Sequence, residues 1–215
     1  MARLLWNATV IGGLALAVLS EARPLVLVHG LWDTPQLFRP LIQLLEQQQR
    51  RQVFAPSLPH RWGAVPLQDL AQELDQQIQA HWGHQEIDIL GFSMGGVISR
   101  LWLQERGGAS RCRRFVSVGS PQRGTFTAQW VPRWPFAGIA DMKRGSALLN
   151  RLNGDLLTLQ AVECISLFCR WDLTVMPGWQ AVLPLGEHQE VPVITHRQLM
   201  RHPRALAQVI RTLQG

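Results

Sequence analysis

The chain has 215 residues, 47% of them hydrophobic and 17% charged, which is enough apolar content for one sizeable core and excludes intrinsic disorder. The formal net charge is +6, but neither aromatic interleaving nor a nucleic-acid motif accompanies the basic residues, so nucleic-acid binding is not expected. The charge is typical of a solvated surface with some attraction to anionic lipid, which leaves a membrane-surface contact open. The three cysteines form neither a disulfide framework nor a metal-ligand pattern.

The first 22 residues form a hydrophobic segment with several interpretations. No charged residue occurs from Leu4 to Ser20, a run of 17 residues that is slightly short of the ~20 a spanning helix needs. Arg3 precedes this run, and residues 20–22 have the small-x-small pattern of a cleavage site, as in a signal peptide. A short anchor and an extra buried helix are the alternatives. Export, membrane association and a cytoplasmic location therefore all stay open.

Short apolar runs alternate with amphipathic segments along the rest of the chain. The expected strands are, in chain order, 25–28, 53–55, 87–90, 115–118, 164–168 and 191–194. The expected helices are 35–49, 66–82, 94–105 and 199–213. This alternation predicts a single α/β domain over 23–215, with a mostly parallel sheet of about six strands and helices on both faces. Residues 125–160, rich in Trp, Pro and Gly, interrupt it as a short cap or acyl-pocket insertion.

A nucleophile elbow is predicted between the third strand and the helix that follows it. Residues 91–95 form a G-x-S-x-G motif in this strand–turn–helix context. The glycines on either side of Ser93 let strand and helix approach closely, and the strained turn exposes the serine hydroxyl beside the positive end of the helix. Ser93 is therefore the candidate nucleophile. The alternative, a Gly/Ser loop that caps a helix, does not account for glycine at both close-approach positions.

A serine nucleophile needs a base and an orienting acid, and in the fold that carries this kind of elbow the acid follows the serine and the base follows the acid. Asp172 comes after the strand at 164–168 and opens a turn-forming segment, although aspartate is also common as a cap or turn residue. Its rivals lie in the irregular region or before that strand: Asp141, Asp155 and Glu163. We predict Asp172 as the acid.

The base is predicted from the same topology. His196 follows the strand at 191–194 and precedes the last helix, the position that the base requires. His188 precedes that strand, and His202 lies within or beside the helix. The alternative for His196 is a histidine of a surface loop. Topology favours His196 as the base.

Two backbone N–H groups should bind the negative oxygen that develops during acyl transfer. One is expected from Met94, the residue after the nucleophile, and the other from Leu31 in the loop after the first strand. His29, at the start of that loop, is expected to fix it by hydrogen bonding. The predicted substrate-binding side chains are Trp32, Trp134 and Phe136.

With these residues placed, the chain resembles the α/β-hydrolase superfamily, and within it the compact bacterial lipases and esterases with little or no lid. The matching stretches are 26–34, 91–96, 119–125, 172–177 and 196–199. The resemblance implies hydrolysis of a small-molecule or lipid ester by a Ser-His-Asp triad through an acyl-enzyme, with no metal or organic cofactor. Two features depart from it. Gln122 stands where those enzymes usually have histidine, and residues 125–160, which shape the acyl pocket, match only loosely.

Two other functions compete with ester hydrolysis. An acyltransferase would use the same triad but deliver the acyl group to an acceptor other than water. A non-catalytic protein that binds lipid or a membrane surface would explain the apolar N-terminus, the nine tryptophans and the positive charge. A complete set of elbow, acid, base and oxyanion loop argues against this second alternative. The sequence does not indicate the number of subunits.

Overall fold

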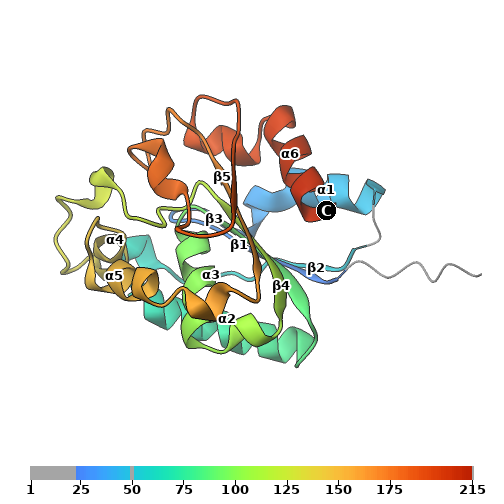
Figure 1. Cartoon of the computed structure of the whole chain (residues 1–215), viewed down its shortest axis with the longest axis horizontal. Coiled ribbons are helices and arrows are strands. Elements are labelled where there is room, and N and C mark those ends of the chain that lie inside the picture. Colours follow the sequence, from blue (N-terminus) through green and yellow to red (C-terminus); the bar gives the residue numbers. More distant parts are fainter. Residues whose placement is uncertain (1–22, 49–50, 215) are drawn as a thin grey trace, which may run out of the picture.

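The computed structural model describes residues 23–48 and 51–214. Within these ranges, six strands form one parallel sheet in the order β2-β1-β3-β4-β5-β6 (Figure 1). The strands are β1 (Leu25–Val28), β2 (Val53–Phe54), β3 (Ile87–Phe92), β4 (Cys112–Val118), β5 (Glu163–Phe168) and β6 (Glu187–Glu190). The predicted parallel sheet of about six strands is confirmed.

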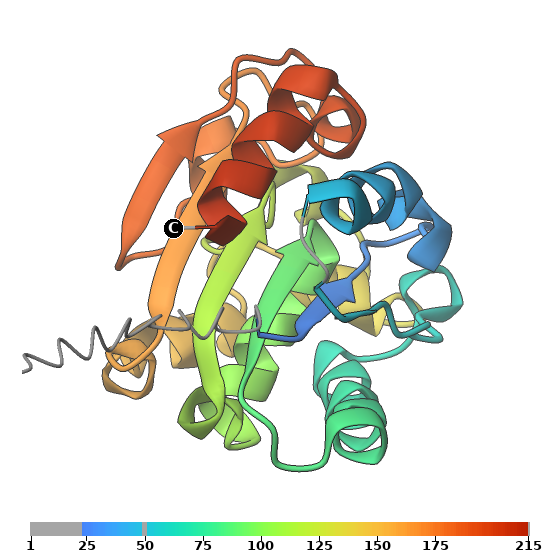
Figure 2. The ribbon, with the colours of Figure 1, turned by 90° about the vertical axis from the view of Figure 1, so that its right-hand side faces the viewer.

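Helices cover both faces of this sheet. They are α1 (Arg39–Gln48), α2 (Leu67–Trp82), α3 (Met94–Glu105), α4 (Ala137–Asp141), α5 (Ala147–Gly154) and α6 (Pro203–Gln214). Helices α1 and α6 pack together against one face, and α2 and α3 pack together against the other (Figures 1 and 2). The predicted doubly covered α/β architecture is therefore confirmed.

Strand β1 shows why a continuous apolar run marks a strand of such a sheet. Leu25 and Leu27 belong to the core between the sheet and helices α1 and α6. Val26 and Val28 point the other way, into the core under α2 and α3. Successive side chains of a strand face opposite sides, so a strand covered by helices on both faces needs an apolar residue at every position.

The sixth strand is not where the sequence predicts it. The apolar run at 191–194 is predicted as a strand, but β6 is the preceding segment, Glu187–Glu190. This strand lies at the edge of the sheet and pairs only with β5, and its polar side chains are largely exposed. No apolar run therefore marks it. Val191 and Val193 follow the end of β6, where the N–H of Val191 still donates to the carbonyl oxygen of Phe168 in β5. Both side chains are buried beside α6, which explains their apolar character.

The last predicted helix also begins later than expected. Residues 196–200 form a short 3-10 turn, and the α-helix α6 starts at Pro203. The predicted insertion at 125–160 contains the short helices α4 and α5. The hydrophobic segment at 1–22 lies outside the described residues. In residues 23–48 and 51–214, no helix is long and apolar enough to cross a membrane.

The cysteines behave as small core residues. Cys112, Cys164 and Cys169 are buried and free of disulfide bonds. Burial raises the pKa of all three thiols, that of Cys164 to about 12. They are therefore protonated at neutral pH and unsuited to nucleophilic chemistry.

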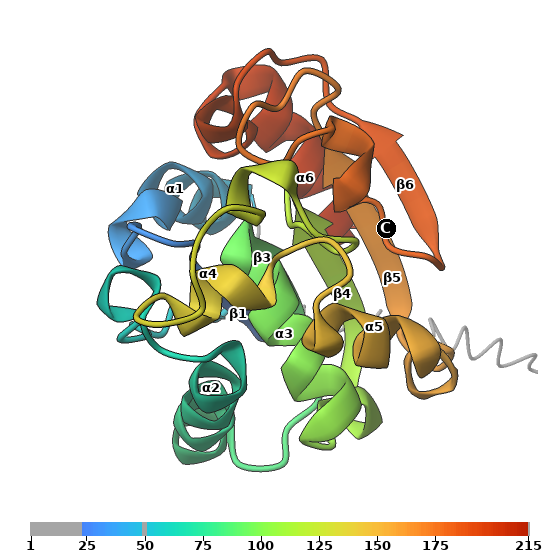
Figure 3. The same cartoon turned by 90° about the vertical axis from the view of Figure 1, so that its left-hand side faces the viewer.

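The loops that follow the strands meet at one end of the molecule. All strands run in the same direction, so their carboxyl ends lie at the same edge of the sheet. Figure 3 shows the molecule from this edge, where α4 and the segment after β4 lie in front of the sheet. Ligands of open parallel sheets bind at this edge.

Candidate active site

Ser93 lies on a sharp turn between β3 and α3. Its backbone has φ 54° and ψ −127°, a strained conformation for a residue with a side chain. Close packing around the turn explains the glycines of the motif. A Cβ on Gly95 would lie 2.1 Å from the carbonyl oxygen of Val28, and one on Gly91 would lie 2.4 Å from Cα of Gly96. The strand–turn–helix context expected for an elbow is therefore present.

Asp172 is held in one orientation by hydrogen bonds to both carboxylate oxygens. Its Oδ1 accepts the backbone N–H groups of Thr174 and Val175, at 2.7 and 3.0 Å. Its Oδ2 lies 2.6 Å from Nδ1 of His196. The carboxylate is buried, so this contact is shielded from water. The structure thus brings together the two residues that the sequence predicts as acid and base.

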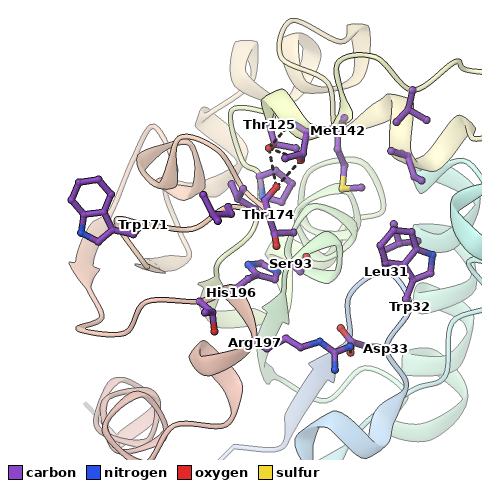
Figure 4. Close-up of a pocket in the computed structure, with 18 of the residues that line it drawn as sticks. Leu31, Trp32, Asp33, Ser93, Thr125, Met142, Trp171, Thr174, His196 and Arg197 are labelled. Atoms are coloured by element: carbon purple, nitrogen blue, oxygen red, sulfur yellow. Dashed lines mark hydrogen bonds and ion pairs between the residues drawn. The ribbon is translucent and has the colours of Figure 1, made fainter.

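The imidazole of His196 is fixed on the side of Asp172 and free on the other. Its ring packs against the ring of Phe92, with centroids 4.8 Å apart, and a Cβ on Gly119 would lie 3.2 Å from Cε1. The opposite nitrogen, Nε2, is buried and accepts no hydrogen bond from any described residue. Figure 4 shows this ring beside Ser93, and both side chains line one cavity. Nε2 is thus the nitrogen that is available as a base.

The expected oxyanion donors lie on the two segments that adjoin Ser93. Met94 is the first residue of α3, where backbone N–H groups have no partner within the helix. The loop after β1 comes so close that a Cβ on Gly30 would lie 2.8 Å from Cβ of Ser93. In residues 23–48 and 51–214, no hydrogen bond engages the N–H of Leu31, which follows Gly30. Both N–H groups are therefore available to a negative oxygen near Ser93.

A cavity of about 830 Å³ opens at Ser93, within the range of small-molecule sites. Its larger apolar side chains come from four of the loops at the carboxyl edge: Leu31, Trp32, Val131, Ile139, Met142, Trp171, Leu173, Val175 and Ile194. Such a wall suits an apolar acyl chain better than a charged one. In the part of the chain that the structure describes, no group of three or more His, Cys, Asp or Glu side chains could hold a metal ion.

Of the three predicted substrate-binding residues, one lines the cavity and two do not. Trp32 lines the cavity. Trp134 is 87% exposed and Phe136 is half-buried, and neither belongs to the cavity wall. The segment around them does contribute to the wall, through residues such as Val131 and Ile139. Because this segment follows no regular period, its sequence does not reveal which of its apolar side chains turn inward.

A comparison of the sequence with models of protein families identifies the family of the chain. Residues 23–154, more than half of the chain, match the model of the alpha/beta hydrolase fold. The chain belongs to the α/β-hydrolase fold family. No curated protein matches it at a significant level.

Several solved structures resemble this α/β hydrolase. Lipase B of Aspergillus fumigatus has a TM-score of 0.74 at 16% identity, and the match covers 90% of this chain and 52% of the lipase. The mature lipase BlEst2 of Bacillus licheniformis has a TM-score of 0.72 at 13% identity, with 90% and 93% covered. The hydrolase MGS-MChE2, from lagoon sediment in Morocco, has a TM-score of 0.66 at 20% identity, with 89% and 90% covered. The chain spans about half of the Aspergillus lipase, and these likenesses establish the fold alone.

One residue that the sequence did not single out ties the loop after β4 to the acid loop of this α/β hydrolase. Oγ1 of Thr125 accepts the N–H of Met176 at 2.9 Å and lies 3.0 Å from the carbonyl oxygen of Thr174. Thr174 is itself bound to Asp172 through its N–H. Thr125 therefore connects the cavity wall to the carboxylate. In the sequence, Thr125 is marked only as the last residue of the Gly-Ser-Pro-x-x-Gly-Thr stretch at 119–125.

Gln122, which stands where the lipases that the sequence resembles usually have histidine, lies in a buried polar network. Its Nε2 donates to Oγ of Ser117 at 2.9 Å, and its carbonyl oxygen accepts from Arg100 at 3.3 Å. Arg100 also donates to Oδ1 of Asn153 at 2.9 Å and to the carbonyl oxygen of Leu152 at 2.7 Å. Burial lowers the pKa of Arg100 to about 10. Gln122 thus joins α3 to the strand and helix on either side, away from the cavity.

His29 fixes the loop after β1, which carries the expected oxyanion donor Leu31, by hydrogen bonds on both ring nitrogens. Its Nε2 accepts the N–H of Leu58 at 3.1 Å, so the proton of the neutral ring is on Nδ1, which lies 3.0 Å from the carbonyl oxygen of Gly30. The N–H of Asp33 donates to the same oxygen at 3.3 Å. In a trans peptide the C=O and N–H point in opposite directions. Holding this carbonyl therefore also sets the direction of the Leu31 N–H.

We expect this buried histidine to make the fold sensitive to acid. Burial lowers the pKa of His29 below its ordinary value of about 6.5, outweighing the hydrogen bond to Gly30, which raises the pKa, and the nearby His60 lowers it further. As the pH falls below that ordinary value, the unfolded chain binds a proton that the folded protein resists. The free energy of unfolding therefore decreases with falling pH, and the contribution of His29 is complete only above about pH 6.5.

Replacement of His29 by glutamine tests this dependence. The variant should be less stable at pH 8 by about 1–3 kcal/mol, because the amide of glutamine replaces only Nε2 and leaves the carbonyl oxygen of Gly30 without its Nδ1–H donor. Its free energy of unfolding should also fall less steeply than that of the wild type between pH 7 and pH 5. Urea unfolding at several pH values measures both effects. Parallel pH profiles for the two proteins would contradict the assignment.

Proposed function

We propose that the protein hydrolyses carboxylic esters with apolar acyl groups through an acyl-enzyme on Ser93. One observation carries this proposal: Asp172 and His196 lie 2.6 Å apart, and the unpartnered Nε2 of His196 faces the cavity that Ser93 lines. A nucleophile, a base with a free nitrogen and a buried acid form the arrangement that serine hydrolases use. The similarity to solved lipase structures supports the same reaction class.

The reaction follows from the position of each group. Nε2 of His196 takes the proton of Ser93, whose Oγ attacks the ester carbonyl, while Asp172 stabilises the imidazolium. The N–H groups of Leu31 and Met94 bind the negative oxygen of the tetrahedral intermediate. His196 then donates its proton to the leaving alcohol. Water, deprotonated by His196, attacks the acyl-enzyme in the same way. The bond to Oγ of Ser93 then breaks, His196 returns the proton to this oxygen, and the carboxylic acid is released.

Access of water supports hydrolysis over acyl transfer. Ser93 is partly exposed at the floor of the cavity, and exposed polar side chains such as Thr127 and Arg197 belong to the cavity wall. Water can therefore reach the acyl-enzyme. An acyltransferase would have to exclude it and offer a site for the acceptor.

The proposal is tested with an activity-based probe and a series of esters. The purified protein should be labelled by a fluorophosphonate and should hydrolyse p-nitrophenyl esters. A non-catalytic lipid-binding protein would give neither result. Addition of an acceptor alcohol separates the remaining alternative, because an acyltransferase would form the new ester in preference to the free acid. A protein that neither reacts with the probe nor releases p-nitrophenol would contradict the proposal.

We expect the segment after β4 to set the preferred acyl length. Val131 lines the cavity and is half-buried, so Val131→Trp should fill part of the space open to an acyl chain. Loss of even a few methylene contacts costs about tenfold in kcat/KM. Decanoate hydrolysis should fall at least that much, whereas acetate hydrolysis should change less than threefold.

The matched control places the same ring elsewhere. Leu157 is 75% exposed in the turn that leads into β5, outside the cavity wall, so Leu157→Trp should leave both rates unchanged. The ratio of kcat/KM for the two esters is the measurement. Equal losses for both esters in Val131→Trp, together with a lower melting temperature, would contradict a role in the acyl pocket.

A further inference from the structure

The exposed apolar side chains of this protein are concentrated at one edge. Among the described residues, eleven large apolar side chains are exposed, and ten of them lie in loops that follow the carboxyl ends of strands. The exception is Leu157, in the turn that leads into β5. Six of the ten are tryptophans, called here the tryptophan rim: Trp32, Trp62, Trp130, Trp134, Trp171 and Trp179. The two other described tryptophans are not exposed.

The rim continues the apolar wall of the cavity out to the surface. Trp32 and Trp171 line the cavity and are also 62% and 70% exposed. Figure 4 places them on opposite sides of Ser93. A soluble protein rarely exposes so many large apolar groups around one opening unless that surface binds something. Tryptophan, with an apolar ring and one N–H donor, is the side chain that favours the boundary between lipid and water.

The same loops carry most of the net positive charge. They contain eight Arg and Lys residues against three Asp, an excess of five out of the net +6 of the whole chain, and one of the eight, Arg170, pairs with Glu190 at the end of β6. The segments counted are 29–38, 55–66, 119–146, 169–186 and 191–202. An edge that is both apolar and cationic complements an anionic lipid surface, since the rings enter the interface while the arginines meet the head groups.

We propose that this edge docks the protein onto an anionic lipid bilayer, with the mouth of the cavity facing the membrane. Docking itself needs no chemistry at Ser93. The consequence that the hydrolysed ester belongs to a lipid of that bilayer rests on the proposed function. A second copy of the chain fits the edge less well, because two such faces would bring like charges together.

Vesicles that cannot be hydrolysed test docking apart from catalysis. The full chain is mixed with vesicles of ether-linked phosphatidylcholine, alone or with an equal amount of ether-linked phosphatidylglycerol, and the bound fraction is measured by sedimentation. The wild type should bind the mixed vesicles at least tenfold more tightly than the neutral ones. Its tryptophan fluorescence should shift to shorter wavelength on binding, and added salt should weaken the complex.

Two pairs of variants assign the binding to this edge. Trp130 and Trp179 lie on different loops and outside the cavity wall. The double variant Trp130→Ala, Trp179→Ala should weaken binding about tenfold per residue, whereas Leu157→Ala should have no effect.

The double variant Arg61→Gln, Arg144→Gln should weaken binding about fivefold per residue. Its control, Arg106→Gln with Arg211→Gln at the ends of α3 and α6, should change binding less than twofold. Hydrolysis of a soluble acetate ester should stay the same in the Trp130/Trp179 variant.

Other outcomes would overturn the proposal. One is equal binding by the Trp130/Trp179 variant and by Leu157→Ala. A second is binding that persists in these variants but disappears when residues 1–22 are removed, since that segment would then be the anchor. A third is no binding to either vesicle. If the protein binds neither vesicle, size-exclusion chromatography decides what the edge does. A dimeric wild type and a monomeric Trp130/Trp179 variant would mean that the edge is an interface between two copies of the chain. If instead the proposed function alone is wrong, the wild type will bind the vesicles but will not hydrolyse esters.

Discussion

Replacement of Ser93 by alanine is expected to lower kcat for ester hydrolysis by about 10⁶-fold and to abolish fluorophosphonate labelling. The change removes the hydroxyl that we propose as the nucleophile and leaves His196 with no hydroxyl to deprotonate. The fold should persist, because the Ser93 side chain makes no capping hydrogen bond to α3 and alanine has the same Cβ on the strained turn. Steady-state assays measure kcat, fluorophosphonate labelling measures the reactive serine, and thermal unfolding measures whether the fold persists.

A second serine provides the control for this prediction. Ser110 is exposed in the turn before β4, far from the cavity wall, so Ser110→Ala should keep full activity and labelling. Some residual hydrolysis is expected from Ser93→Ala, because the oxyanion donors and the cavity still bind substrate. Labelling of Ser93→Ala with unchanged stoichiometry would show that another residue is the nucleophile.

The sequence is sufficient for the elbow because its signals are local. An apolar run, a turn with two glycines and a helical period follow one another at 87–105, and the structure has β3, Ser93 and α3 in the same places. Asp172 and His196 are further apart in the chain. Their placement follows from the order of elements, since each comes after a strand at the edge where Ser93 lies. A parallel sheet brings such residues together whatever the loops between them contain.

The details that the sequence does not give depend on contacts between distant residues. Strand β6 is polar because it is an exposed edge, so its place is decided by pairing with β5 and not by its own residues. The hydrogen bonds of Thr125 to the loop of Asp172 join residues about 50 positions apart. Similarly, Trp134 and Val131 are both counted as apolar in the sequence, and only the path of the chain places one outward and the other in the cavity wall.

Replacement of Asp172 by asparagine is expected to reduce kcat by about 10⁴-fold without unfolding the protein. The reason lies in the two N–H groups that bind Oδ1. They require an acceptor, so the amide oxygen of asparagine takes that position and its NH₂ group faces Nδ1 of His196. Nδ1 must then accept a hydrogen bond, which moves the ring proton to Nε2. In this tautomer His196 cannot take the proton of Ser93.

A combined variant separates this effect from a loss of structure. His196→Ala alone should cost several orders of magnitude in kcat, and Asp172→Asn added to it should cost little more, because Asp172 acts only through the imidazole. Asp155→Asn, at an exposed position after α5, is the matched control and should keep full activity. Independent, multiplying losses in the double variant would mean that Asp172 supports the loop rather than the base. Activity of Asp172→Asn within tenfold of the wild type would place the acid elsewhere.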